Sequence, residues 1–339
     1  MLHLTDHGLH CEAGGFFVDP WGPVARAVIT HAHGDHLAYG CEHYLTSASG
    51  RAVAQRRLGA GAVVEGLEYG HARTINGVRV SLHPAGHILG SAQVRLEHRG
   101  EVWVVSGDYK VEPDPTCAPF EPVPCHTFVT ESTFGLPVYQ WPAQGEVFDA
   151  IHAWWRANQA DGRTSLLFGY ALGKAQRLLA GLDPSVGPIL THGAVEQMTA
   201  LYREEGVAMP PTTYALAVER GDDWKRAIVV APPGAERTPW ARRFGDAATG
   251  MASGWMRVRG ARRRRGVDRG FTLSDHVDWP GLLQAIASTG ASRVWVTHGF
   301  TAPVVRWLQD QGLEARAIAT RYEGDERADT EPMDGTADG

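Results

Sequence analysis

The first third of the chain alternates short apolar runs with polar loops. Five runs are β-branched or alternate apolar with polar side chains, and Gly, Pro or Asp residues bound them. They lie at residues 16–19, 27–30, 78–83, 92–98 and 102–108. Such runs predict β-strands. Four of the five end close to a histidine or an aspartate. Functional side chains at strand ends are typical of a site on a layered α/β scaffold.

From about residue 144 the apolar spacing changes to a helical period. The predicted elements that follow are a helix at 146–159, a strand at 165–170, a helix at 173–182, a strand near 188–192 and a helix at 194–205. Strands that alternate with helices predict a parallel α/β module. A basic, glycine-rich stretch at 251–270 closes the module. The chain then returns to a helix (279–288), a strand (293–298) and a helix (302–311), and we see no internal repeat.

The composition is that of a globular protein. Of 339 residues, 43% are hydrophobic and 21% charged, which excludes collagen-like, coiled-coil and wholly disordered chains. No apolar stretch approaches the roughly 18 residues of a membrane span, and the first residues lack a signal-peptide pattern. The four cysteines are scattered without a CxxC pair. We therefore expect a cytoplasmic protein that has no contact with a membrane.

Charge is distributed unevenly along the chain. The net charge is −6, but residues 136–272 hold 18 Lys or Arg against 13 Asp or Glu, a net +5 that leaves −11 for the rest. The last 16 residues (324–339) hold six acids and one arginine with almost no apolar side chains, which predicts a disordered acidic tail. A basic middle within an acidic chain suggests that a polyanion meets one face.

A dense histidine cluster follows the predicted strand at 27–30. The motif HAHGDH supplies His31, His33, Asp35 and His36. Three imidazoles and a carboxylate within six residues destabilise a fold unless something binds them. Because His31 and His33 alternate, they can point the same way, while Asp35 and His36 on the next turn reach a second point. This arrangement suits two borderline cations in one site. The alternative is a solvated histidine-rich turn.

Further ligands for a metal pair stand at other strand ends. His87 lies between glycines after a predicted strand, Asp108 ends the run at 102–108 where its carboxylate can bridge two ions, and His298 ends the run at 293–298. Each of the two histidines alone would be an ordinary polar residue. Their recurring position at strand ends, together with the first cluster, favours a metal site.

The ordered motifs are similar to those of a known superfamily. HAHGDH, PAGHILGSA (84–92) and SGDYK (106–110), with Asp19 ending an early strand, resemble the metallo-β-lactamase superfamily. TESTFG (130–135), LSDHVDW (273–279) and VTHGF (296–300) resemble the additional motifs of its β-CASP branch of nucleic-acid nucleases. GYALGKAQ (169–176) and residues 252–276 are most similar to bacterial DNA-ligase-associated exonucleases. The resemblance covers most of residues 1–322.

The resemblance implies a role for each of these residues. His31, His33 and His87 would hold one divalent metal ion, and Asp35, His36 and His298 the other, with Asp108 as the bridge. Asp19 would orient a ligand imidazole. Glu131 would orient His276, which would protonate the leaving oxygen. The ions would be zinc or manganese, with iron as a third option. For His276 the alternative is a loop residue before a helix, and we expect Asp278 to cap that helix.

The resemblance also implies an α/β fold, namely an αββα metallo-β-lactamase sandwich with an inserted α/β β-CASP domain. The corresponding boundaries are 1–143 and 273–323 for the two parts of the sandwich, 144–272 for the insertion and 324–339 for the acidic tail.

The candidate substrate-binding residues are mostly basic. Six arginines lie within nine positions: Arg257, Arg259, Arg262, Arg263, Arg264 and Arg265. They suit phosphate contacts, and Trp255 before them suits stacking on a base. A solvated loop enriched in arginine by genome composition is the alternative. Lys174 after the Gly173 turn suits a terminal phosphate, and Ser132 and Thr133 are candidates for binding the same phosphate.

These features favour a two-metal phosphodiesterase, specifically a DNA exonuclease that acts from the 5′ end in DNA repair, in functional association with a DNA ligase. A ribonuclease is the alternative, because a histidine such as His298 at the third β-CASP motif is more typical of RNA-processing members. A small-molecule hydrolase is disfavoured by the basic insertion and by the Glu131–His276 pair. A catalytically dead scaffold is disfavoured because every expected ligand is present.

Overall fold

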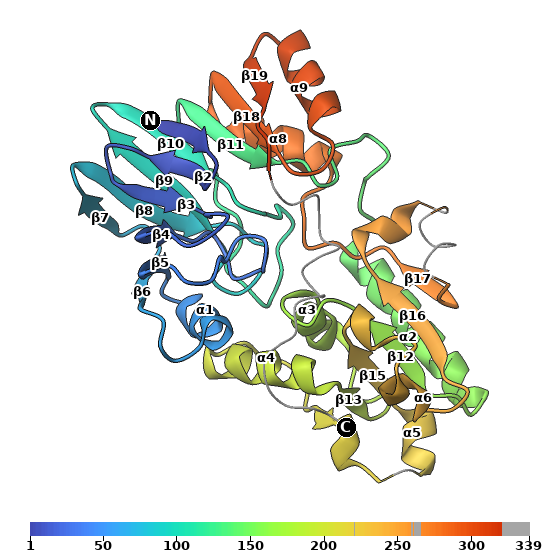
Figure 1. The fold of residues 1–339 in the computed structure, drawn as a ribbon. Coiled ribbons are helices and arrows are strands. Elements are labelled where there is room, and N and C mark those ends of the chain that lie inside the picture. Colours follow the sequence, from blue (N-terminus) through green and yellow to red (C-terminus); the bar gives the residue numbers. More distant parts are fainter. Residues whose placement is uncertain (220, 259, 261–265, 321–339) are drawn as a thin grey trace. The chain divides into compact units, whose positions relative to one another are not determined.

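The computed structural model describes residues 1–219, 221–258, 260 and 266–320, which form two compact units (Figure 1). The first unit holds Met1–Gln140 and the described residues from His276 onward, and the second holds Trp141–Asp275. The predicted acidic tail at 324–339 lies outside the described residues. Within them, no helix is long and apolar enough to cross a membrane.

Two sheets form the frame of the first unit. One has its strands in chain order: β1 (Leu2–Thr5), β2 (Gly8–Cys11), β3 (Phe16–Val18), β4 (Arg26–Val28), β5 (His43–Ser47) and β6 (Val64–Leu67). The other runs in the order β19 (Glu314–Ala317), β18 (Arg293–Thr297), β11 (Thr127–Glu131), β10 (Glu101–Val105), β9 (Ala92–His98), β8 (Val78–Pro84) and β7 (Ala72–Ile75).

Alternating apolar side chains pack these two sheets face to face. Val18 and Val28 of the first sheet share one core with Val80 and Val94 of the second. The opposite face of the second sheet is covered by α8 (Trp279–Thr289) and α9 (Thr301–Asp310), whose buried residues share a core with β11 and β18. Helix α1 (Arg51–Leu58) contacts β5 and β6. The first unit is therefore layered, with the sheets in the middle.

Strand direction decides where the loops of this unit meet. In the second sheet, β8, β10, β11 and β18 run in the same direction, since β9 is antiparallel to both β8 and β10, and the pairs β10–β11 and β11–β18 are parallel. In the first sheet, β3 is parallel to β4. The carboxyl ends of parallel strands lie at one edge of a sheet, so each sheet gathers the loops that follow these strands along one edge.

The second unit is a parallel sheet with helices on both faces. Its strand order is β14 (Thr213–Tyr214), β13 (Ile189–Thr191), β15 (Ile228–Ala231), β12 (Ser165–Phe168), β16 (Ala248–Ala252) and β17 (Arg269–Phe271), and every pairing is parallel. One core is formed with α2 (Gln144–Ala160), α3 (Lys174–Gly181) and α4 (Gly193–Glu204). A second core includes Trp224 of α5 (Asp222–Arg226) and Trp240 of α6 (Pro239–Arg242).

The predicted α/β class and the predicted parallel module are confirmed. The strand at 92–98 has the predicted limits, and β3, β4, β8 and β10 differ from prediction by one to three residues. Strand β11 was not predicted. All five of its residues are buried, because Phe128 faces one core and Val129 the other, so its sequence shows no alternation of polar and apolar positions.

Candidate metal centre

The seven predicted metal ligands converge in the first unit. The loop after β4 carries the HAHGDH motif, and His87, Asp108 and His298 follow β8, β10 and β18. Two groups result, one of His31, His33, His87 and Asp108 and the other of Asp35, His36 and His298; within each group the ligand atoms lie within 4.8 Å of one another. Strand direction and sheet packing therefore bring together residues that are far apart in the sequence.

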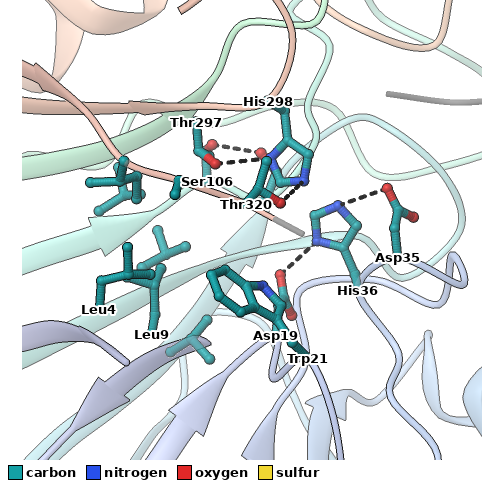
Figure 2. Close-up of a pocket in the computed structure, with 16 residues that line it drawn as sticks. Leu4, Leu9, Asp19, Trp21, Asp35, His36, Ser106, Thr297, His298 and Thr320 are labelled. Atoms are coloured by element: carbon teal, nitrogen blue, oxygen red, sulfur yellow. Dashed lines mark hydrogen bonds and ion pairs between the residues drawn. The ribbon is translucent and has the colours of Figure 1, made fainter. Parts of the chain in front are cut away.

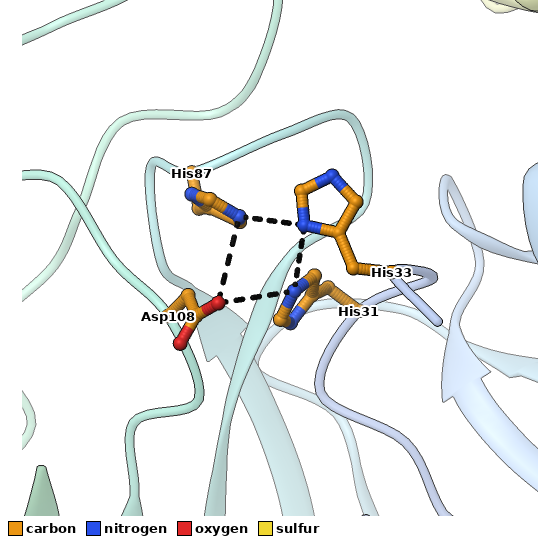
Figure 3. A group of neighbouring side chains, drawn as sticks. All are labelled: His31, His33, His87 and Asp108. Carbon is orange, nitrogen blue, oxygen red and sulfur yellow. Dashed lines mark hydrogen bonds and ion pairs between the residues drawn. The ribbon is translucent and has the colours of Figure 1, made fainter. Parts of the chain in front are cut away.

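The first group has the spacing of a tetrahedral site. His33 Nδ1 lies 3.1 Å from both His31 Nε2 and His87 Nε2 (Figure 3). Asp108 Oδ2 completes the group at 3.5 Å from His31 Nε2 and 3.9 Å from His87 Nε2. Zinc–nitrogen bonds of about 2.0–2.1 Å in a tetrahedron place ligand atoms roughly 3.3 Å apart. The observed spacing fits such an ion without rearrangement.

A glycine lets the loop of His87 approach so closely. Gly86 has φ +75°, and a Cβ there would lie 2.3 Å from the carbonyl oxygen of Lys110. The amide of Lys110 in turn donates to the carbonyl of Ala85 at 3.0 Å. Any other residue would push apart the loops that carry His87 and Asp108, so the glycine in this motif is required by packing.

The second group shares Asp108 with the first. His36 Nε2 lies 3.4 Å from Asp108 Oδ2 and 3.7 Å from Asp35 Oδ2. This nitrogen is buried and has no hydrogen-bond partner among the described residues. The ring of His298 stacks on that of His36 with centroids 5.3 Å apart. A buried nitrogen without a partner, surrounded by carboxylate oxygens, fits the coordination of a cation.

Asp19 fixes the orientation of His36. Its Oδ2 lies 2.8 Å from His36 Nδ1 (Figure 2). The same carboxylate accepts hydrogen bonds from the backbone amide (2.8 Å) and hydroxyl (2.6 Å) of Thr30. With Nδ1 donating to Asp19, Nε2 of His36 is the nitrogen presented to the site. Asp19 (φ 45°) and His298 (φ 53°) both have left-handed backbones, which in non-glycine residues cluster at functional sites.

The electrostatics of the cluster favour a neutral imidazole at two positions, His31 and His298. Burial, together with the charge of His36, holds the pKa of His31 well below its usual value, and burial also lowers the pKa of His298. Burial opposes charge on His36 too, but the carboxylates of Asp108, Asp35 and Asp19 outweigh it and raise its pKa. Neutral imidazole is the form that binds metal, so His31 and His298 are already in the ligand form.

A carboxylate–imidazole pair lies beside the first group. His276 Nδ1 is 2.9 Å from Glu131 Oε2 and 3.1 Å from Oε1, and both side chains are buried. Glu131 also accepts a hydrogen bond from the amide of Tyr109 at 2.8 Å. The His276 ring packs against His87, with centroids 4.8 Å apart. Because Nδ1 contacts Glu131, Nε2 is the nitrogen of His276 that is left to face a reacting group.

A small pocket adjoins the second group. Leu4, Leu9 and Trp21 line one side, and Asp35, His36 and His298 line the other (Figure 2). The pocket is lined by predicted metal ligands together with apolar residues of the two sheets.

The predicted substrate-binding residues differ in their burial and in the groups that they contact. Ser132 and Thr133 are buried, and the hydroxyl of Ser132 donates to the carbonyl oxygens of Thr297 and His298. Ser132 therefore holds the turn that carries His298, a contact that sequence reasoning missed. Trp255 is half-buried and Arg257 exposed. Arg259, Arg262, Arg263, Arg264 and Arg265 lie outside the described residues.

Lys174 is enclosed in the second unit. It is 2% exposed, and its Nζ lies 2.8 Å from Asp275 Oδ1. In this conformation the ammonium is paired with a carboxylate, which opposes a role as an open phosphate anchor. Sequence reasoning missed Asp275 as its partner. Asp278 caps α8 as predicted, since its side chain accepts from the amide of Gly281 at 2.9 Å.

Several known proteins have sequences similar to this chain. The chain is 35% identical to a protein named probable DNA ligase from Opitutus terrae over 316 residues, which are 92% of this chain and 30% of that protein. It is 32% identical to the endoribonuclease ysh1 of Aspergillus fumigatus over 124 residues (36% and 14% of the two chains). It is 30% identical to endoribonuclease YSH1 of Saccharomyces cerevisiae over 124 residues (35% and 15%). The chain therefore spans under a third of each relative.

No family model matches the chain. A crystal structure of a protein of unknown function from Enterococcus faecalis shares the fold, with a TM-score of 0.53 and 10% identity over 80% of this chain and 74% of that one.

Proposed function

We propose that this chain, which belongs to the β-CASP branch of the metallo-β-lactamase superfamily, is a metal-dependent nuclease that hydrolyses phosphodiester bonds in nucleic acid. The observation that carries the proposal is the position of Asp108 Oδ2, 3.5 Å from His31 Nε2 and 3.4 Å from His36 Nε2. One carboxylate thus serves two adjoining groups of metal ligands, as a two-metal phosphodiesterase requires.

The layers of the first unit support an αββα metallo-β-lactamase sandwich. Its two parts would be residues 1–143 and 273–323, with the β-CASP domain inserted at 144–272. The doubly wound sheet that contains β12 to β17 supports the inserted domain. The compact units, which change over after Gln140 and Asp275, support boundaries near these positions.

The described residues fit two divalent cations. One cation would be held by His31, His33 and His87, and the other by Asp35, His36 and His298. Asp108 would bind both cations. Zinc and manganese suit this imidazole and carboxylate set, with iron as a third option. When bound, such a pair lowers the pKa of a water molecule to near neutrality and neutralises the charge of the phosphodiester.

His276 would give a proton to the leaving oxygen. Glu131 holds the ring through Nδ1, so the ring presents Nε2 to a reacting group. The proton would come from Nε2–H of the imidazolium form, which a neighbouring carboxylate stabilises, and the ring would become neutral as the proton leaves. An alkoxide is a poor leaving group, and its protonation contributes a factor of about 10²–10⁴ to the rate of such reactions.

DNA is the substrate that we propose, with digestion from the 5′ end in repair and functional association with a DNA ligase. The relative named probable DNA ligase supports the association with a ligase. In that relative, a segment similar to this protein and further sequence belong to a single chain. Trp255 and Arg257, together with Arg259 and the four arginines at 262–265, would contact the strand. Ser132, Thr133 and Lys174 would serve the terminal phosphate only if Lys174 leaves Asp275.

A ribonuclease is the second candidate. The similarity to endoribonucleases over about 124 residues and the presence of His298 favour it.

A nuclease assay separates the two candidates. End-labelled single-stranded DNA and RNA of identical sequence, with and without a 5′-phosphate, are incubated with the protein in manganese and in zinc, beside the double variant Asp35→Ala/His36→Ala. Mononucleotides released from DNA alone, and lost in the double variant, would support the DNA exonuclease. Equal or faster cleavage of RNA would assign the ribonuclease, and no cleavage of either would overturn the proposal.

A further inference from the structure

Three charged side chains of the second unit meet in its interior. Asp275 Oδ1 lies 2.8 Å from Lys174 Nζ and 3.1 Å from Arg177 Nη1. The exposed fractions of Lys174 and Arg177 are 2%, and that of Asp275 is 4%. Arg177 also donates from Nη1 to the carbonyl oxygen of Ser274, and from Nε to Gln144 Oε1 at 3.2 Å. We call Lys174, Arg177 and Asp275 the charge clamp.

Helix α3 supplies both cations from a rigid position. Lys174 and Arg177 are three residues apart and so lie on one face of the helix. Gly173, at φ +86°, turns the chain into the helix, and its amide donates to Gln176 Oε1 at 2.8 Å. The first six residues of α3 are all buried. The two cations therefore have little freedom to follow Asp275 if it moves.

Stability alone does not account for the clamp. Charges taken out of water lose solvation, and a well-packed apolar set of similar volume is often as stable as a buried ion pair, or more so. A buried cluster of three charges does, however, fix one arrangement, because breaking it leaves a buried charge uncompensated. The position of Asp275 in the clamp, directly before His276 in the sequence, indicates which residue the clamp fixes.

Asp275 is bonded directly to the proposed proton donor. The residues after His276 are held separately: the amide of Val277 donates to the carbonyl of Tyr109 at 2.7 Å, and Asp278 caps α8. Within the second unit, the clamp restrains the backbone that leads to His276; within the first unit, Tyr109 and α8 restrain the backbone that follows it. We propose that Lys174 and Arg177 hold Asp275 as a positioning residue for His276, an inference that rests on the proposed nuclease function.

Loss of the clamp would act through the geometry of His276. Adjacent Cα atoms are about 3.8 Å apart, so a shift of Asp275 is transmitted to the backbone of His276. A misplacement of about 1 Å in a catalytic group can reduce the rate by about 10². Misplacement of His276 slows proton donation to the leaving group. The rate should therefore fall strongly for an alkoxide leaving group and little for a leaving group that needs no proton.

Two substrates and three variants test this inference. The substrates are single-stranded DNA, whose leaving group is an alkoxide, and the p-nitrophenyl ester of thymidine 5′-phosphate, whose phenolate leaves without protonation. His276→Asn removes the donor, Asp275→Asn removes the clamp charge while keeping the side-chain shape, and Glu196→Gln is the control. Glu196 is a half-buried carboxylate of the same unit that accepts from Thr191 and Thr212 and pairs with Arg203.

His276→Asn should lose about 10²–10⁴ in rate on DNA and less than about tenfold on the ester. Asp275→Asn should show the same selectivity, with a loss of about 10–10² on DNA. Glu196→Gln should stay within about twofold on both substrates. Equal losses on both substrates, or no loss, in Asp275→Asn would overturn the positioning role while leaving the nuclease function standing.

Failures of the underlying function give different patterns. If His276→Asn loses as much rate on the ester as on DNA, the proton-donor role of His276 is wrong. The positioning inference is then wrong as well. If the unaltered protein cleaves neither substrate, the nuclease proposal itself is overturned.

A second variant covers the case in which Asp275→Asn does not fold. The triple variant Lys174→Met/Arg177→Met/Asp275→Leu replaces the clamp with apolar side chains of similar volume, which is expected to preserve folding. Nuclear magnetic resonance then follows the imidazole N–H of His276, assigned by its absence in His276→Asn. We expect a sharp signal in the unaltered protein and a broadened or shifted one in the triple variant. An unchanged signal together with full activity on DNA would overturn the inference.

Discussion

Two buried clusters of charged or ionisable side chains, one in each unit, are built in opposite ways. In the metal centre, His33 Nδ1 faces two other ring nitrogens at 3.1 Å, and His36 Nε2 has no hydrogen-bond partner among the described residues. In the clamp, the carboxylate of Asp275 meets two cations at 2.8 and 3.1 Å. The first cluster thus leaves a buried nitrogen that a cation would satisfy, whereas the second pairs its carboxylate with two cations. The proposed binding site and the proposed positioning device therefore differ in how their polar atoms are satisfied.

The largest effect is expected from breaking the metal centre at its shared ligand. Asp108→Asn keeps the shape of the side chain but removes the charge that serves both groups of ligands. Two-metal catalysis supplies several kcal/mol of transition-state stabilisation, so we expect a loss of about 10³ or more in the rate of DNA cleavage. Bound metal, measured by elemental analysis, should fall as well. Full metal content with full activity would contradict the shared role of Asp108.

The second-largest effect is expected from breaking the Glu131–His276 pair. Glu131→Gln leaves a neutral partner that cannot stabilise a charged imidazole, and we expect a loss of about 10² or more in rate on DNA, within the usual range for acid–base catalysis. Metal content should stay at the level of the unaltered protein, because neither residue is among the seven proposed ligands. Loss of metal in this variant would place Glu131 in the metal centre instead.

A smaller effect is expected from Asp19, which touches a ligand but belongs to neither ligand group. Asp19→Asn weakens the hold on His36 Nδ1, and loss of such a contact typically reduces metal affinity by about 10–100-fold. Competition with a chelator of known affinity measures the change. Glu196→Gln is a control, since Glu196 is a half-buried carboxylate of the second unit that accepts from Thr191; it should not shift the metal affinity.

The smallest effect is expected from an exposed ion pair. Arg73 and Glu65 have side chains 46% and 48% exposed, and hydrogen bonding to Arg73 lowers the pKa of Glu65. A carboxyl group with a lowered pKa stabilises the folded state above the pKa of the unfolded chain and loses this effect as the pH falls. Glu65→Gln should therefore cost less than about 1 kcal/mol at neutral pH and nothing in acid, as measured by urea unfolding. A larger cost would show that exposure alone does not weaken such a pair here.

Much of the metal centre could be predicted from the sequence because its information is local. Four ligands stand within six residues, Asp108 and His298 end apolar runs, and His87 follows such a run between two glycines. The strand at 92–98 was predicted to the residue because its alternation reflects one buried face. The resemblance to the metallo-β-lactamase superfamily then supplied the pairing of ligands with ions.

What sequence reasoning missed depends on partners far along the chain. Lys174 after a glycine turn suits a phosphate anchor, and nothing nearby in the sequence indicates Asp275 as its partner. Ser132 likewise follows β11 as a plausible phosphate contact, yet its hydroxyl bonds to the carbonyl of His298. Strand β11 itself shows no alternation, because both of its faces are buried. In each case tertiary packing decides what a polar or apolar residue does.

Native mass spectrometry of the protein loaded with zinc tests the central claim most directly. We expect two zinc ions on each unaltered chain. In Asp35→Ala/His36→Ala, which removes two ligands of the second group, we expect one ion, retained by His31, His33, His87 and Asp108. A chain that binds no zinc, or a double variant that keeps two ions, would contradict a centre built from two groups of ligands joined by Asp108.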